Sequence, residues 1–152
     1  MPVPCALDTS NVNESEPCGS ATDNGCNAAG ESQPISTGSI VGGTLWADAN
    51  TRDSDFYSFS VAAGSQVTLS VKAARLVNVL ILSGDITVAN CAGISVLASG
   101  AGSCPTVTTY CLNPGVYYAF VSDSAFTGNP CGSGAFNDYT MSLTSAPATC
   151  PI

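Results

Sequence analysis

From Ser39 onward, short runs of alternating apolar and polar residues recur along the chain, separated by clusters of Gly, Pro, Asn and Ser. Alternation with a period of two is typical of β-strands that bury one face. The runs are rich in β-branched and aromatic residues, which favour strand over helix. We therefore predict strands at 39–47, 55–62, 65–73, 77–83, 94–99, 106–112, 115–122 and 138–145.

The alternation also assigns a face to each residue of these strands. In the run 55–61, Tyr57, Phe59 and Val61 share one side, and the intervening residues share the other. One buried face and one hydroxyl-rich face are typical of an antiparallel sandwich. About eight such strands with long connections predict an all-β fold, an antiparallel β-sandwich with jelly-roll or Greek-key topology.

Residues 1–36 lack this periodicity and are rich in Asn, Ser, Gly, Pro, acidic residues and Cys. Three cysteines, Cys5, Cys18 and Cys26, fall within this segment. We predict an irregular N-terminal arm, tethered by disulfides, on a β-sandwich formed by residues 37–152. A chain of 152 residues fits one domain with an ordinary hydrophobic core.

The eight cysteines predict a disulfide framework and an oxidising, extracellular compartment. No segment has the pattern of a signal peptide, so we expect that an export signal has been removed. Local spacing favours particular pairs, although exchanges involving the neighbours Cys104 and Cys111 stay open. The favoured pairs are Cys18–Cys26, Cys91–Cys104, Cys111–Cys131 and Cys5–Cys150.

The net charge is −8, and the basic residues are Arg52, Lys72 and Arg75. Three scattered cations cannot neutralise the phosphates of a nucleic acid, nor attract an anionic membrane. No apolar run approaches the roughly 18 residues of a membrane span, so we expect no membrane insertion. The chain has no histidine, which removes the commonest general base and zinc ligand.

Acidic residues gather at two places, at Glu14 and Glu16 in the arm and at Asp53 and Asp55 before an aromatic strand. Residues two apart on a strand project to the same side, so Asp53 and Asp55 can point toward one locus. Oxygen ligands without histidine or free thiolate suit a hard cation, calcium above magnesium. The alternative is a solvated turn with ordinary acidic residues.

Six short motifs occur in order along the chain. They are Glu14-x-Glu16-Pro17, Gly42-Gly43-Thr44-Leu45, Asp53-x-Asp55-Phe56-Tyr57-x-Phe59, Ala62-Ala63-Gly64-x-x-Val67, Pro114-Gly115-x-Tyr117-Tyr118-x-x-Val121 and Asp138-Tyr139-x-Met141-x-Leu143. The ordered set resembles the bacterial pre-peptidase C-terminal domain, similar to the collagen-binding domains of secreted bacterial collagenases. The resemblance spans roughly residues 13–145, although the segment between Pro17 and Ser39 is unusually long and carries two cysteines.

The resemblance implies a β-sandwich with a jelly-roll-like topology and, as in several members of the family, calcium that joins the N-terminal segment to the first strands. Glu14, Glu16, Asp53 and Asp55 match the acidic positions of the family's motifs. With the resemblance included, calcium is the expected cofactor, and these four residues are its expected ligands.

In the collagenase relatives, exposed aromatic residues on one sheet bind collagen. By parity, Phe56, Tyr110 and Tyr118 are the candidates for such a surface in this chain. The alternative is that neighbouring loops cover each ring, and collagen specificity is not carried over.

We expect no catalysis. Without histidine the usual activated serine cannot be assembled, and Lys72 has no catalytic motif around it. A reactive thiol would need histidine or nearby cations to lower its pKa. Asp53 and Asp55 could hydrolyse glycosides in principle, but their spacing offers no cleft between them.

The expected function is therefore a non-catalytic, calcium-stabilised, extracellular binding or adhesion module of a secreted bacterial protein. Its partner would be extracellular matrix, a cell-surface protein or a glycan. A self-assembling structural subunit of an extracellular filament or layer is the alternative, because only 9% of the residues are charged. A glycan-binding or glycan-cleaving domain is a third possibility.

Overall fold

The computed structural model describes residues 6–20, 24–26 and 30–151. Its eight longer strands occupy the eight ranges predicted from the sequence, with shifts of a few residues at the ends. These strands are β3 (Ile40–Thr44), β6 (Ser54–Val61), β7 (Ser65–Ala73), β8 (Val77–Gly84), β9 (Ile94–Gly102), β10 (Thr106–Leu112), β11 (Gly115–Asp123) and β12 (Asp138–Pro147).

Four two-residue strands were not predicted, because they are too short to show alternation: β1 (Val12–Asn13), β2 (Gln33–Pro34), β4 (Ala47–Asp48) and β5 (Thr51–Arg52). Two short 3-10 helices, Ala89–Cys91 and Gly134–Asn137, lie in connections between strands. Among the described residues, no helix is long and apolar enough to cross a membrane.

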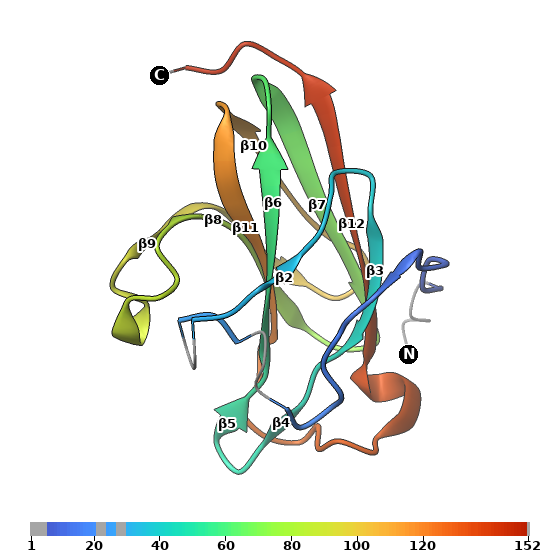
Figure 1. Cartoon of the computed structure of the whole chain (residues 1–152). Coiled ribbons are helices and arrows are strands. Elements are labelled where there is room, and N and C mark those ends of the chain that lie inside the picture. Colours follow the sequence, from blue (N-terminus) through green and yellow to red (C-terminus); the bar gives the residue numbers. More distant parts are fainter. Residues whose placement is uncertain (1–5, 21–23, 27–29, 152) are drawn as a thin grey trace.

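The strands form two sheets, in the orders β1-β3-β12-β7-β10 and β2-β6-β11-β8-β9 (Figure 1). The chain passes between the sheets at most connections, so that β12 returns between β3 and β7 while β11 returns between β6 and β8. This interleaving is a jelly roll of two nested Greek keys. The predicted fold class is confirmed.

The sheets are mixed rather than purely antiparallel. The pairs among the eight longer strands are antiparallel, but β1 pairs with β3 and β2 pairs with β6 in parallel. In Figure 1 the arm runs beside β3 and then reaches β6 through β2. The arm therefore contributes one short edge strand to each sheet, which ties it to both layers.

The main core lies between the sheets and contains the residues that the alternation assigns to the inner face. Tyr57, Phe59 and Val61 of β6 are buried there. Burial of such side chains contributes about 1.5–3 kcal/mol each to folding. The other strands of the two sheets add Val41, Val67, Leu69, Val71, Val77, Val79, Ile81, Leu112, Ala119, Val121, Tyr139, Met141 and Leu143.

A second apolar cluster lies on the outer side of the second sheet. Phe56 and Phe120 meet there edge to face, with ring centroids 5.0 Å apart, and Leu82, Ile86 and Cys26 pack around them. Gly25 of the arm lies against the Phe56 ring, where a Cβ atom would come within 2.6 Å of the ring carbons. The arm thus covers Phe56, one of the aromatic residues predicted for a ligand surface.

The disulfides differ from the pairs that local spacing favours. Cys18 bonds Cys131, Cys26 bonds Cys91 and Cys111 bonds Cys150, over sequence separations of 113, 65 and 39 residues. The predicted pairs Cys18–Cys26, Cys91–Cys104 and Cys111–Cys131 are wrong, and Cys5–Cys150 is excluded because Cys150 bonds Cys111. Cys5 itself lies outside the described residues.

Spacing is a poor guide here because a jelly roll places segments that are distant in sequence side by side. Cys104 is also disulfide-bonded. The seven described cysteines are therefore all oxidised, as the sequence predicts.

Candidate metal centre

The first two acidic residues of the site come from the start of β6. The amide of Asp53 donates to the carbonyl of Trp46 at 2.9 Å, which fixes the chain where β6 begins. Asp53 and Asp55 are 1% and 0% exposed, so both carboxyl groups leave water on folding. Burial of a carboxylate is costly unless it is paired or bound to a metal.

The other two acidic residues come from the arm, which a strand pairing aligns with the sandwich. β1 pairs with β3, and the amide of Glu14 continues this pairing with a 2.8 Å hydrogen bond to the carbonyl of Gly42. Thr44 then donates its amide to Glu14 Oε1 at 3.0 Å. The amide of Ser15 donates to Gln33 Oε1 at 2.8 Å, so the Gln33 side chain holds the residue between Glu14 and Glu16.

The four predicted carboxyl groups converge. Glu14, Glu16 and Asp55 each offer an oxygen, and these atoms lie within 4.8 Å of one another. The Asp53 carboxyl is hydrogen-bonded to Glu16. In the orientation that satisfies its neighbours, the Asn24 amide donates to Asp53 Oδ1 at 3.2 Å. Sequence positions 37 or more apart thus form one cluster in the folded chain.

The cluster is electrostatically strained without a cation. Burial, followed by the negative charges of Glu16 and Glu14, raises the pKa of Asp53 from its ordinary value of 3.8 to about 9. Near neutral pH the Asp53 carboxyl therefore holds a proton that a bound cation would displace. A divalent ion would lower the pKa of Asp53 instead, because it favours the ionised form of every carboxyl around it.

A buried chain of two tyrosines supports the cluster. Tyr139 donates its hydroxyl to Asp55 Oδ2 at 2.6 Å, and the Tyr57 hydroxyl lies 2.5 Å from that of Tyr139. Burial, followed by the charge of Asp55, raises the pKa of Tyr139, so its hydroxyl stays a donor. Gly43 makes room for the pair, since a Cβ atom there would lie 2.7 Å from the Tyr139 oxygen. Sequence reasoning missed both hydroxyls because alternation marks these rings as core residues alone.

The donor set fits calcium. Carboxylate oxygens from separate segments suit a hard ion that accepts six to eight oxygen ligands in flexible geometry. A pocket of about 440 Å³, lined in part by Glu14, Glu16, Gly42, Gly43 and Tyr139, gives solvent access to the centre. An ion could therefore enter without opening the sandwich.

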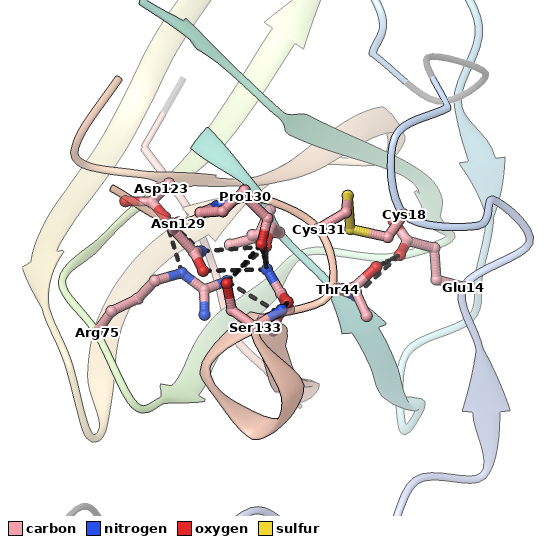
Figure 2. The surroundings of a disulfide bond; sticks show 11 residues. Glu14, Cys18, Thr44, Arg75, Asp123, Asn129, Pro130, Cys131 and Ser133 are labelled. Carbon is pink, nitrogen blue, oxygen red and sulfur yellow. Dashed lines mark hydrogen bonds and ion pairs between the residues drawn. A yellow bond between two sulfur atoms is a disulfide. The ribbon is translucent and has the colours of Figure 1, made fainter. Parts of the chain in front are cut away.

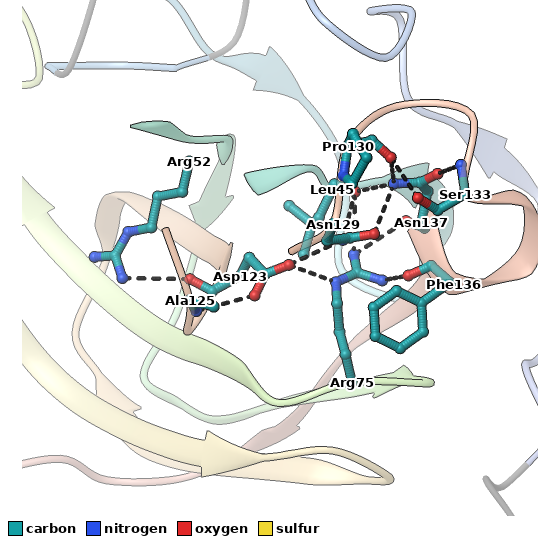
Figure 3. Close-up of polar contacts among 10 residues, drawn as sticks. All are labelled: Leu45, Arg52, Arg75, Asp123, Ala125, Asn129, Pro130, Ser133, Phe136 and Asn137. Atoms are coloured by element: carbon teal, nitrogen blue, oxygen red, sulfur yellow. Dashed lines mark hydrogen bonds and ion pairs between the residues drawn. The ribbon is translucent and has the colours of Figure 1, made fainter. Parts of the chain in front are cut away.

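A second buried charged cluster surrounds Arg75 (Figure 3), and Figure 2 shows Arg75 and Glu14 at the same end of the sandwich. Arg75 is 7% exposed, and its Nε lies 2.9 Å from Asp123 Oδ2. The guanidinium also donates to the carbonyls of Phe136 and Asn137. The side-chain amide of Asn129 donates to Asp123 Oδ2 at 2.9 Å. Burial lowers the pKa of Arg75, while Asp123 opposes that shift and favours the charged form.

This cluster, which the sequence did not reveal, anchors the segment 124–137 between β11 and β12. That segment carries Cys131, whose disulfide to Cys18 fixes the arm two residues after Glu16 (Figure 2). The strand pairing of β1 before Glu14 and this disulfide after Glu16 hold both ends of the acidic stretch.

The three aromatic residues predicted for a ligand surface differ in their exposure to solvent. Phe56 is 1% exposed and is wrong as a ligand platform, because the arm covers it. Tyr118 is half-buried against the second apolar cluster. Tyr110 is 40% exposed on β10.

Comparisons with known proteins bear on the fold. No protein-family model matches the sequence, and no curated protein matches it. Among solved structures, the chain is similar to the pre-peptidase C-terminal domain of a collagenase from Bacillus anthracis, with 19% sequence identity and a TM-score of 0.54. The similarity covers 75% of this chain and 95% of that domain. The chain therefore has the fold of a pre-peptidase C-terminal domain, as the ordered motifs predicted.

Proposed function

We propose that the chain is a non-catalytic, extracellular binding module whose arm is held on the sandwich by calcium. The calcium assignment rests on the convergence of carboxylate oxygens from Glu14, Glu16 and Asp55, which lie within 4.8 Å of one another. The carboxyl of Asp53 is hydrogen-bonded to Glu16 and so belongs to the same cluster. Four carboxyl groups brought together in a buried place need a positive charge among them to ionise together.

Each supporting contact then has a role toward the ion. Tyr139 orients Asp55, and the Thr44 amide orients Glu14, so that both carboxylates present a fixed oxygen. Such outer contacts tune affinity as well as geometry. When bound, calcium would supply charge neutralisation and a cross-link between arm and sandwich.

The fold and the disulfides support the module and its location. The similar solved structure is one domain of a collagenase, that is, a domain within a larger protein. Seven described cysteines in disulfides indicate an oxidising compartment. Matrix, cell-surface protein or glycan is the class of partner that this location makes available.

Thermal unfolding with and without chelator tests the calcium assignment. We expect EGTA to lower the melting temperature of the wild type by several degrees, and Asp53→Asn to remove most of that difference. Asp48→Asn is the matched control, because it deletes an exposed carboxylate outside the cluster. If wild type, Asp53→Asn and Asp48→Asn respond alike to EGTA, the assignment is wrong.

One observation favours self-assembly as a second candidate. The segment 86–122 contains no charged residue, and it forms the edge strands β9 and β10. Natural edge strands are usually protected by charges, yet Val96 and Val107 are 56% and 50% exposed here. Light scattering at micromolar concentration tests this, since ordered polymers without a partner would replace the module by a structural subunit.

A further inference from the structure

The basic residues of the chain differ in how they are neutralised. Lys72 Nζ lies 2.8 Å from Asp8 Oδ1, and Arg75 pairs with Asp123. Arg52 forms no ion pair with any carboxylate among the described residues. In a chain with a net charge of −8, this leaves one cation available to an anionic ligand.

Arg52 is held in place by weak contacts that leave most of its donors available. One Nη1–H donates to the carbonyl of Asp123 at 3.3 Å, and the guanidinium carbon lies 4.3 Å from the centroid of the Phe126 ring. Figure 3 shows Arg52 and Arg75 on opposite sides of Asp123. Because a guanidinium has five N–H donors in a planar fork, the ring contact orients the plane without occupying the fork.

A groove of about 490 Å³ adjoins Arg52 on the outer side of the second sheet. The register explains its lining, because Leu80 of β8 lies opposite both Phe120 of β11 and Ser99 of β9. Opposite residues point to the same face, so these three side chains form one row. Asn78, two residues from Leu80, also lines the groove and begins the next row. The result is an apolar floor between a cation, an amide and a hydroxyl.

The next row has a further unused polar group. Ser122 lies opposite Asn78 in the register and is fully buried. Its hydroxyl has no hydrogen-bond partner within the part of the chain that the structure describes. Buried polar groups are normally satisfied, but Ser122 does not line the groove, so this hydroxyl is not one of the ligand contacts.

We propose that this groove binds a sugar residue that carries a single carboxylate, such as a uronic acid. The carboxylate would meet Arg52, whose fork matches it with two hydrogen bonds. Asn78 and Ser99 would bind ring hydroxyls, and the apolar face of the ring would lie on Leu80. The proposal rests on the proposed role as a binding module and gives that role a ligand class, but none of the four calcium-site carboxylates lines the groove.

Two observations favour a sugar with one charge over other anions. The groove offers one cation, and the remaining charge of the protein is negative, so a polyanion would be repelled. Gly100 and Ala101 of β9 are small, which leaves width for a ring beside Leu80. Pockets of this volume with an apolar lining and a few polar groups are typical of small-ligand sites.

The test is a titration of the full chain with glucuronic acid, followed by NMR chemical shifts of the Asn78 side chain and the Arg52 Nε–H. A single sugar should bind with a dissociation constant of about 1 mM. Arg52→Gln should weaken binding at least about tenfold, and Ala101→Trp, which fills the groove and keeps Arg52, should abolish it. Lys72→Gln is the matched control for lost charge, and melting curves check that each variant folds.

Glucose, which lacks the carboxylate, should bind about tenfold more weakly or not at all. The proposal is overturned by no saturable shift with glucuronic acid, by equal binding of glucose, or by unchanged affinity in Arg52→Gln. Tighter binding of N-acetyl-glycylglycine than of glucuronic acid would also overturn it, in favour of an acidic peptide end. The EGTA dependence of the melting temperature does not involve the groove, so failure here leaves the calcium proposal separately testable.

Discussion

The two buried charged clusters at one end of the sandwich are neutralised in different ways. The Arg75 cluster contains its own cation, and Asp123, Asn129 and backbone carbonyls surround it. The candidate metal centre instead collects Glu14, Glu16, Asp53 and Asp55, so its negative charge must be neutralised by a cation from solution or by protons.

The two clusters differ in how far their stability depends on solution conditions. An internally neutralised cluster is stable at any calcium concentration, and it anchors the segment that carries Cys131. A cluster of like charges is stable only with a bound cation or with some of its carboxyls protonated. The attachment of the arm should therefore depend on calcium and pH, whereas the stability of the rest of the sandwich should not.

Removing the internal cation should produce the largest effect. Arg75→Met leaves Asp123 buried and unpaired and should lower the free energy of unfolding by about 3–5 kcal/mol. Urea denaturation measures this, and added calcium should not restore the loss. Lys72→Met, which breaks an ion pair whose side chains are 28% and 35% exposed, should cost less than about 1 kcal/mol. Equal losses in the two variants would contradict the account.

Removing one acid from the metal centre should have an effect whose size depends on calcium. In saturating calcium, at about 100 times the dissociation constant, Asp53→Asn should lose up to about 2.7 kcal/mol relative to wild type. In EGTA the same change removes a carboxyl that must take up a proton to be buried at neutral pH, so it should be neutral or stabilising. Urea denaturation in both buffers checks the change, and a loss that is the same in both would show that calcium is not involved.

The pH dependence should follow the raised pKa of Asp53. Its pKa is 3.8 ordinarily and about 9 in the folded chain without a cation, so the folded state binds more protons between these values. Stability in EGTA is therefore highest below the lower value and falls as the pH rises toward the higher one. Melting temperatures from pH 5 to 9 should fall for wild type and fall less for Asp53→Asn. Parallel curves would argue against the shift.

Removing the hydroxyl groups of the two buried tyrosines should have the smallest effect. Tyr139→Phe removes the hydrogen bond to Asp55 and should lower calcium affinity by about 10–100-fold. Tyr57→Phe, one hydroxyl further away, should change affinity less. Calcium titrations of the two variants measure the contrast, and equal affinities would assign the tyrosines to packing alone.

Much of the fold could be predicted from residue patterns. The alternation of Tyr57, Phe59 and Val61 placed these residues in the core because a sheet has a period of two. The convergence of the arm acids with Asp53 and Asp55 was also predictable, from their types and from the ordered motifs. Short spacing misassigned the disulfides, because partners such as Cys18 and Cys131 meet through topology rather than through a local loop.

What the sequence did not reveal depends on contacts between distant segments. Phe56 has the parity of an outer-face residue, and no local pattern announces that Gly25 and the Cys26–Cys91 disulfide cover it. Arg75 likewise reads as one of three scattered cations until the fold brings Asp123 and the carbonyls of the 124–137 segment around it.

Calcium binding to the acidic cluster is measured by a calorimetric titration of calcium into chelator-treated protein at pH 7, repeated in buffers with different ionisation enthalpies. We expect saturable binding with release of protons, because the pKa of Asp53 near 9 means that the folded chain holds a proton there until the cation arrives. Asp53→Asn should bind more weakly and release fewer protons. Absence of saturable calcium binding in the wild type, or binding without any proton release, would contradict the account.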